Sequence, residues 1–169
     1  MKYWIGLGSN RGDRLATLRS AAAALGVTGA ILGRSRVFAS SPVGGPPQPP
    51  FLNAAVVLES DLDPLSLLRA LQQIEADFGR DREHETVRWG PRTLDLDILL
   101  VGARGETPIE LAELSVPHPL LHERAFALAP LLDLEPNLFH PTQARTLLSL
   151  LHATQQKGGH ACAPTGDLL

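Results

Sequence analysis

Two aspartates separated by one residue give the strongest chemical signal in the sequence. Asp95 and Asp97 flank Leu96 in a segment, residues 93–101, in which acidic and apolar side chains alternate. Residues two apart on a β-strand project from the same face, with about 7 Å between their Cα atoms, so both carboxylates would point at one spot. Oxygen ligands at that spacing suit Mg²⁺, as one ion or as a pair. A strand with one solvated face also carries alternating acids, so the pair alone leaves both interpretations open.

A run of arginines directly precedes the acidic pair and favours the metal interpretation. The guanidinium fork matches phosphate oxygens through two parallel hydrogen bonds. Polyphosphates also supply the anionic co-ligands that Mg²⁺ takes beside carboxylates. Some of these arginines could instead pair with the acids between them, Asp81, Glu83 and Glu85. The combination predicts a metal and polyphosphate site built from Asp95, Asp97 and the arginines Arg80, Arg82, Arg88 and Arg92.

Three further side chains could contact a ligand, and each has a structural alternative. Trp89 lies in a polar segment, where its indole could stack on a planar ligand or anchor a loop over the sheet. Asn53 could present its amide to the edge of a heterocycle or satisfy a sheet edge. His118, between two prolines, could face a phosphate or a metal, although a lone histidine is more often structural. The glycine-containing segment 6–10 lacks P-loop spacing, which excludes an ordinary P-loop kinase.

The elements that must position these residues follow a β-α-β-β-α-β order. Apolar runs predict strands over residues 3–8, 31–40, 51–60 and 93–101. Helices are predicted from Asp13 to Gly26 and from Asp63 to Gly79, each with an N-cap acid and a C-terminal glycine. This order predicts an α+β fold of the ferredoxin-like type, with an antiparallel sheet and both helices on one face. Further helices are predicted over residues 119–132 and 142–151, and the proline-rich segment 41–50 is expected to be an exposed loop.

The overall composition limits the possible function classes. The chain has 169 residues, of which 44% are hydrophobic and 20% charged, and this composition is typical of one globular domain. We predict that the domain spans residues 1–156 and that residues 157–169 form a mobile tail. A net charge of -3 gives no general attraction for nucleic acid. Cys162 is the only cysteine, which excludes a disulfide framework, and no apolar stretch is long enough for a signal core or a membrane span. We therefore expect a cytoplasmic monomer with small-molecule substrates and no nucleic-acid or membrane partner.

Several short motifs occur in an order that resembles one enzyme family. They are Gly8-Ser9-Asn10, Phe51-Leu52-Asn53-Ala54, the block from Arg88 to Asp97, and Val116-Pro117-His118-Pro119 followed by Arg124-Ala125-Phe126. Together they resemble the 6-hydroxymethyl-7,8-dihydropterin pyrophosphokinases of folate biosynthesis, over residues 3–150. The resemblance implies transfer of the β,γ-pyrophosphoryl group of MgATP to the pterin hydroxymethyl oxygen, with release of AMP.

The resemblance also implies roles for individual residues. Asp95 and Asp97 would hold two Mg²⁺ ions, and Arg80 and Arg92 would neutralise charge on the transferred group, so these four form the implied catalytic set. The implied ATP contacts are Gln72, Glu75, Arg82, Arg88, Trp89, Arg92, Ile98, Ser115, His118 and Arg124. The implied pterin contacts are Gly8, Ser40, Pro42, Val43, Phe51, Asn53, Trp89, Asp95 and Phe126, with the pterin ring between the two phenylalanines.

Two other interpretations were weighed against this one. A ferredoxin-like module could bind a ligand without catalysis, or bind RNA, but such RNA binders expose aromatic residues on the strands where this chain has Asp95 and Asp97. A two-metal phosphodiester hydrolase would need more acidic ligands than one pair. The chain also departs from some family members, since Pro119 stands where they have a tyrosine and the segment between Gly79 and Arg88 is longer.

Overall fold

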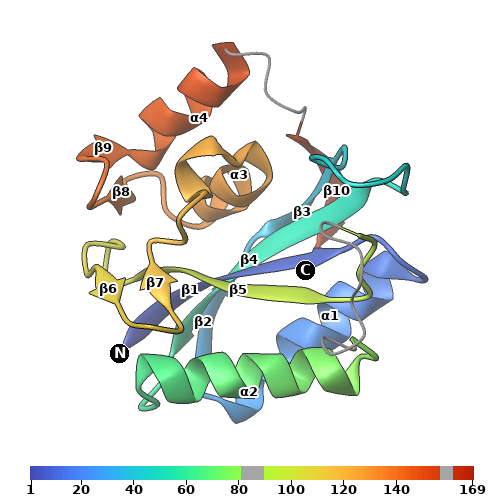
Figure 1. The fold of residues 1–169 in the computed structure, drawn as a ribbon, viewed down its shortest axis with the longest axis horizontal. Coiled ribbons are helices and arrows are strands. Elements are labelled where there is room, and N and C mark those ends of the chain that lie inside the picture. Colours follow the sequence, from blue (N-terminus) through green and yellow to red (C-terminus); the bar gives the residue numbers. More distant parts are fainter. Residues whose placement is uncertain (81–89, 157–161) are drawn as a thin grey trace.

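An antiparallel sheet of six strands forms the centre of the molecule in the computed structural model, which describes residues 1–80, 90–156 and 162–169 (Figure 1). The strands are β1 (Lys2–Ser9), β2 (Ala30–Arg34), β3 (Arg36–Ser40), β4 (Phe51–Glu59), β5 (Asp95–Val101) and β10 (Cys162–Leu168). They lie in the order β10-β3-β4-β1-β5, with β2 beside β4. The predicted α+β class with an antiparallel sheet is confirmed.

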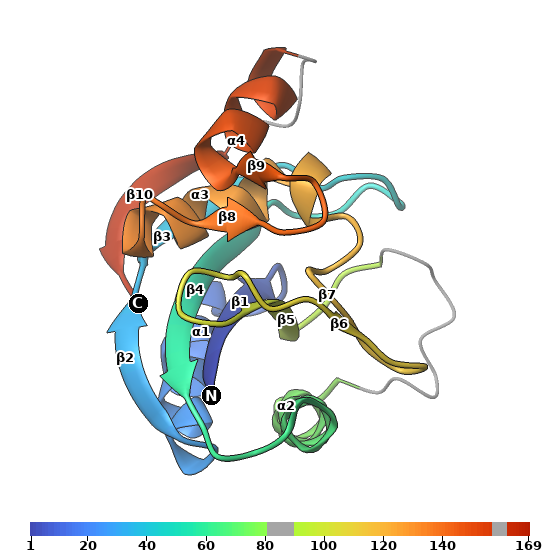
Figure 2. The same cartoon turned by 90° about the vertical axis from the view of Figure 1, so that its left-hand side faces the viewer.

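Helices cover both faces of this sheet (Figures 1 and 2). α1 (Arg14–Ala24) and α2 (Pro64–Asp77) pack on one face, and α3 (Ala125–Leu134) and α4 (Leu147–Gln156) lie on the other. Successive residues of β1 enter the two cores, because Ile5 packs with α1 and α2 whereas Trp4 packs with α3 and α4. Within the three described ranges, no helix has both the length and the apolar character needed to cross a membrane.

The two ends of α2 follow the sequence closely and set the position of Arg80. Asp63 caps the first turn, because its carboxylate accepts two backbone N–H groups at 3.0 and 3.1 Å. At the other end Gly79 has a φ of +82°, a conformation that favours glycine. The N–H of Arg80 then donates to the carbonyl of Glu75 at 3.0 Å. This turn directs the side chain of Arg80 toward β5.

The region between α1 and β4 departs from the prediction in two places. The chain does not turn at Gly26 but continues from α1 into a 3-10 turn, η1 (Leu25–Val27). The strand predicted over residues 31–40 is interrupted at Ser35, which separates β2 from β3. There the Ser35 hydroxyl accepts the N–H of Ala55 at 2.8 Å and takes the place of a backbone carbonyl in the ladder. A side chain that substitutes for the backbone in this way breaks the regular pairing.

The region after β5 contains more short strands than predicted. A small hairpin joins β6 (Ile109–Glu110) to β7 (Ser115–Val116). The helix expected over residues 119–132 begins only at α3, after a 3-10 turn, η2 (Leu121–Glu123). The helix expected over residues 142–151 begins at α4, because a second hairpin, β8 (Phe139–His140) with β9 (Arg145–Thr146), comes before it.

The tail differs most from the sequence prediction. No regular structure was expected after residue 156, whereas β10 pairs with β3 at the edge of the sheet. Arg19 Nε donates to the carbonyl of Leu168 at 3.0 Å, and this bond fixes the end of β10 against α1. Pro164 and Gly166 interrupt the sequence pattern, but an edge strand tolerates such residues where an inner strand does not.

Candidate active site

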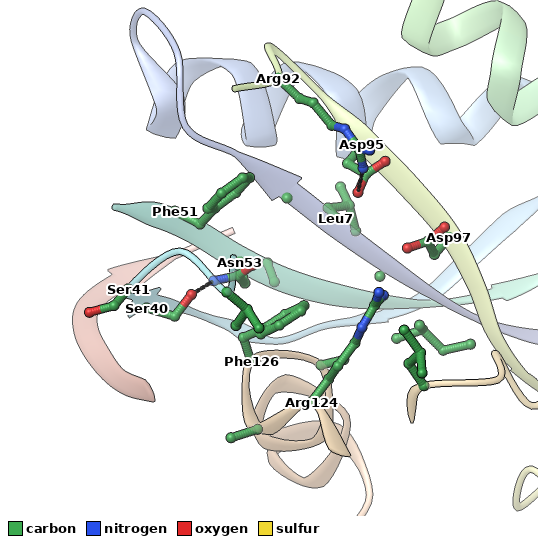
Figure 3. A pocket seen from close by; sticks show the side chains of 18 of the residues that line it. Leu7, Ser40, Ser41, Phe51, Asn53, Arg92, Asp95, Asp97, Arg124 and Phe126 are labelled. Carbon is green, nitrogen blue, oxygen red and sulfur yellow. Dashed lines mark hydrogen bonds and ion pairs between the residues drawn. The ribbon is translucent and has the colours of Figure 1, made fainter. Parts of the chain in front are cut away.

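A cavity of about 490 Å³ opens between the sheet and the start of α3 (Figure 3). β1, β4 and β5 supply one wall, and the residues around η2 and the first turn of α3 supply the opposite wall. The cavity is lined by ten of the residues implied by the sequence: Gly8, Ser40, Val43, Phe51, Asn53, Arg92, Asp95, Asp97, Arg124 and Phe126. Residues that are far apart in the chain thus meet in one place.

Asp95 and Asp97 both line the cavity from β5. The pairing of β5 with β1 places Asp95 opposite Gly8 and Asp97 opposite Gly6. A Cβ at Gly8 would lie 3.8 Å from the Asp95 Cβ and 3.6 Å from Asn53 Oδ1, so a side chain there would occupy the space between them. The absence of a side chain at Gly8 therefore keeps the cavity open beside Asp95.

The two carboxylates have different electrostatic surroundings. Burial alone would raise the pKa of Asp95, but the charges of Arg92 and Arg80 hold that pKa below its usual value. Arg92 NH1 lies 2.9 Å from Asp95 Oδ2. Burial, with the charge of Asp95 added, raises the pKa of Asp97 to about 7, although the Arg124 guanidinium opposes the shift. Two close carboxylates with too little positive charge around them fit a hard divalent cation.

Arg80 is held beneath Asp95 by a second carboxylate. Its NH1 lies 2.6 Å from Glu75 Oε1 and 2.5 Å from Asp95 Oδ1. Glu75 Oε1 also accepts the N–H of Leu96 at 2.7 Å. Glu75 is fully buried, and the Arg80 side chain is only 4% exposed. Glu75, which the resemblance places among the ATP contacts, thus faces Arg80 and β5 here and does not line the cavity.

Another part of the cavity presents two aromatic rings and an amide. Phe51, at the start of β4, and Phe126, in the first turn of α3, are partly buried, and their rings lie on either side of Asn53 (Figure 3). Asn53 Nδ2 donates to Ser40 Oγ at 2.9 Å, which fixes the orientation of the amide. Two aromatic faces near a fixed amide suit a planar heterocycle with hydrogen-bonding groups on its edge.

Arg124 adds positive charge on the α3 side of the cavity. Its guanidinium points toward Asp97 (Figure 3), and its NH1 lies 3.5 Å from His118 Nε2. His118 Nδ1 accepts the N–H of Leu120 at 3.1 Å. Burial and the charge of Arg124 lower the pKa of His118 to about 4. The imidazole is therefore neutral near pH 7, and it can form hydrogen bonds to a ligand but does not supply a positive charge.

Of the implied residues that the structure describes, the following do not line the cavity. Ile98 is buried in the core, Gln72 is partly buried on α2, and Ser115 Oγ donates to Glu110 at 2.7 Å. Pro42 lies between two lining residues, Ser41 and Val43. Three others, Arg82, Arg88 and Trp89, belong to residues 81–89 and lie outside the described residues.

Eleven other residues line the cavity, and none of them was named individually as a candidate contact. They are Gly6, Leu7, Ser41, Gln48, Ala54, Gly90, Leu99, Leu120, Glu123, Ala125 and Ala127. The sequence did contain a signal for Gly6. Gly6 and Gly8 are two residues apart, as are Asp95 and Asp97, and on neighbouring strands such pairs can lie opposite each other. Ala54, Gly90 and Ala125 lie within the motifs that carry the family resemblance, where their neighbours were the named contacts.

Comparisons with known sequences point to one family. A family model described as 7,8-dihydro-6-hydroxymethylpterin-pyrophosphokinase (HPPK) matches residues 4–136. A Bacillus subtilis protein named 2-amino-4-hydroxy-6-hydroxymethyldihydropteridine pyrophosphokinase is 47% identical over 133 residues, which cover 78% of this chain and 76% of that protein. A Pseudomonas aeruginosa protein of the same name is 48% identical over 124 residues, which cover 73% of this chain and 72% of that protein.

Comparison with solved structures shows the same fold in longer proteins. The crystal structure of Plasmodium falciparum HPPK-DHPS wild type with STZ-DHP matches 92% of this chain with a TM-score of 0.70. The match covers 43% of that chain, so this protein corresponds to less than half of it. The sequence identity is 15%, and the likeness is therefore one of fold.

Proposed function

Because the chain belongs to the 7,8-dihydro-6-hydroxymethylpterin-pyrophosphokinase family, we propose that it transfers pyrophosphate from ATP to 6-hydroxymethyl-7,8-dihydropterin, a step of tetrahydrofolate biosynthesis. The products are AMP and the pterin diphosphate. One observation carries the proposal: a single cavity holds an aromatic and amide site beside a site of carboxylates and arginines. Such a cavity suits a planar heterocycle and a polyphosphate bound next to each other.

The pterin would bind at the aromatic side of the cavity. Phe51 and Phe126 would stack on the two faces of the ring, which favours a flat heterocycle over an aliphatic ligand. Asn53 has an amide already oriented by Ser40, so it can read the ring edge without first losing rotamer freedom. The other pterin contacts in this proposal are Gly8, Ser40, Pro42, Val43, Trp89 and Asp95.

The triphosphate would bind at the charged side of the cavity. Arg92 and Arg124 line it, and Arg80 lies directly behind Asp95. We propose that Asp95 and Asp97 hold two Mg²⁺ ions, because the charge of the pair is incompletely balanced by the arginines. Bound Mg²⁺ would neutralise the phosphate oxygens and orient the triphosphate. His118, Gln72, Ser115, Arg82, Arg88 and Trp89 remain proposed nucleotide contacts. The side chains of Glu75 and Ile98 are buried away from the cavity, so for these two we propose only an indirect role behind the nucleotide site.

The reaction is a displacement at the β-phosphorus of ATP. The hydroxymethyl oxygen of the pterin forms a bond to that phosphorus, and the bond from the same phosphorus to the oxygen of the α-phosphate breaks. The hydroxyl proton passes to solvent, and AMP leaves with the oxygen that bridged the α- and β-phosphorus atoms. The residues of the chain contribute by orienting both substrates and by stabilising negative charge through Arg80 and Arg92, so no covalent enzyme intermediate is required.

A product assay tests this function. Incubation with MgATP and 6-hydroxymethyl-7,8-dihydropterin should give AMP and the pterin diphosphate in equal amounts. Formation of ADP would mean transfer of a single phosphoryl group. Formation of AMP without the pterin would mean hydrolysis. Folded protein that binds the pterin without turnover would favour a non-catalytic ligand-binding module, the class that membership of this family disfavours.

We also propose that the core is ferredoxin-like and that residues 1–156 form the pyrophosphokinase domain, extended at its edge by β10. The order β3-β4-β1-β5, with α1 and α2 on the same face, supports the ferredoxin-like arrangement. We further propose that the protein acts as a cytoplasmic monomer with no nucleic-acid or membrane partner, in keeping with its net charge of -3. Sedimentation of the purified protein tests the monomer.

A further inference from the structure

Asn10 connects two segments that border the cavity. Its Nδ2 donates to Gln48 Oε1 at 2.8 Å and to the carbonyl of Pro49 at 3.2 Å. Its Oδ1 accepts the N–H of Arg92 at 2.7 Å, and its own N–H donates to the carbonyl of Arg92 at 3.1 Å. One residue at the end of β1 is therefore bonded to the proline-rich loop and to the segment that leads into β5.

Both polar atoms of this side chain have partners within the protein. An asparagine amide has two N–H donors and one carbonyl acceptor group, and all of these have partners here. Asn10 is 1% exposed and does not line the cavity. A residue that binds a ligand would need a polar atom facing the cavity, and Asn10 has none there. Its burial and its bonds to two segments instead indicate that it links those segments.

Two of the three partner residues of Asn10 lie on the cavity wall. Gln48 lines the cavity from the same loop as Ser41 and Val43. Arg92 lines it on the charged side, where its guanidinium is bonded to Asp95 at 2.9 Å. A shift of the proline-rich loop would pull on the Asn10 amide, and the same amide holds the backbone from which the Arg92 side chain extends.

We propose that Asn10 is a positioning residue that couples the loop carrying Gln48 to the segment carrying Arg92, so that loosening one segment loosens the other. The consequence for catalysis rests on the proposed function, since Arg92 acts there on the transferred group. The mechanical link itself does not rest on it. Neither Asn10 nor Gln48 contacts the reacting atoms in this proposal.

Hydrogen exchange tests the link independently of turnover. Gln48→Leu removes the nearer of the two acceptors of Asn10 Nδ2 and leaves the Pro49 carbonyl in place. The N–H of Arg92 should then exchange at least about tenfold faster, although no group bonded to that N–H has been changed. Gln48→Glu keeps an acceptor oxygen at the same position and should retain native exchange. Asn10→Ala should accelerate exchange in both segments. Circular dichroism checks that each variant is folded. If Asn10→Ala fails to fold, Gln48→Leu still tests the link, because it changes only a partly buried loop residue.

Steady-state kinetics separate coupling from a local effect on the pterin. Under the proposal, Gln48→Leu lowers kcat at saturating substrates about tenfold, because Arg92 is displaced, and Gln48→Glu restores kcat. A change confined to the KM for the pterin, together with unchanged exchange at Arg92, overturns the proposal. Absence of turnover in the native protein would instead contradict the proposed function, and the exchange result would still decide whether Asn10 links the two segments.

Discussion

Glu75 accepts a hydrogen bond from the backbone N–H of Leu96 at 2.7 Å, and Leu96 is the residue between Asp95 and Asp97. The same carboxylate oxygen lies 2.6 Å from Arg80 NH1. A single buried group on α2 therefore fixes both the strand that carries the two aspartates and the arginine behind them. The geometry of the charged part of the cavity depends on this contact between α2 and β5.

Replacing Glu75 by alanine should destabilise the protein strongly. The substitution removes an acceptor from the buried Arg80 guanidinium and from the N–H of Leu96, and breaking a buried ion pair from one side costs about 3–5 kcal/mol. Glu75→Gln keeps an acceptor oxygen and should cost less. Urea unfolding followed by circular dichroism measures both losses. Asp77→Ala, an exposed acid on the same helix, is the control, and an equally large loss in that variant would refute the role given to Glu75.

His140 should make the protein less stable in mild acid. Burial and the neighbouring His122 lower the pKa of His140 to about 4, whereas an unfolded histidine titrates near about 6.5. The unfolded state therefore takes up the proton first on acidification. Stability from the neutral ring is present above about pH 6.5 and is lost as the pH falls toward 4. Urea titrations measure the free energy of unfolding at about pH 7 and at about pH 5. Between these two pH values it should fall less in His140→Asn than in the native protein.

His152→Asn is the matched control for this experiment, because His152 is exposed on α4. It should retain the native dependence of stability on pH. If the free energy of unfolding falls equally with pH in His140→Asn and in His152→Asn, the loss of stability in acid does not come from the buried His140.

Phe126→Leu should weaken pterin binding and leave nucleotide binding unchanged. Leucine fills much of the same apolar space but lacks a flat face, and the loss of an aromatic contact is about 0.5–1.5 kcal/mol, or roughly 2- to 12-fold in Kd. Calorimetric titration with 6-hydroxymethyl-7,8-dihydropterin and, separately, with the α,β-methylene analogue of MgATP measures the two affinities. Phe139→Leu, at an exposed position on β8, should change neither. A native pterin affinity in Phe126→Leu would exclude stacking on this ring.

Ending the chain after Gln156 should uncover the edge of the sheet at β3. The residues of β3 that pair with β10 in the full-length chain should then exchange their amide hydrogens faster, because water reaches groups that β10 covers. The amides of β1, which lies on the other side of β4, serve as the internal control. Unchanged exchange in β3 would mean that the pairing with β10 does not persist in solution.

The parts of the fold that the sequence predicts well are those specified locally. Asp63 and Gly79 mark the ends of α2 because capping and a left-handed turn are decided within a few residues. Asp95 and Asp97 share a face because alternation along a strand is also a local property. The presence of these elements therefore follows from the sequence pattern alone.

The features that the sequence does not reveal depend on contacts between distant segments. Glu75 looks like an ordinary polar residue near a helix end, and its burial follows only from the approach of Arg80 and β5. Asn10 lies in a recognisable motif, but its partners are 38 and 82 residues away along the chain. The tail becomes a strand because β3 offers an unpaired edge, and its own composition does not favour one.

The most direct test of the proposed reaction follows the individual phosphorus atoms of ATP. The protein is incubated with 6-hydroxymethyl-7,8-dihydropterin and MgATP labelled at either the α- or the β-phosphorus, and the products are separated. Transfer of pyrophosphate predicts that the β-label moves to the pterin while the α-label stays in AMP. Transfer of the β-label to the pterin, and release of the α-label as AMP, should both fall more than about a hundredfold in Asp95→Asn and in Asp97→Asn. Recovery of the β-label in ADP or in free pyrophosphate, or undiminished transfer in the two variants, would contradict the account.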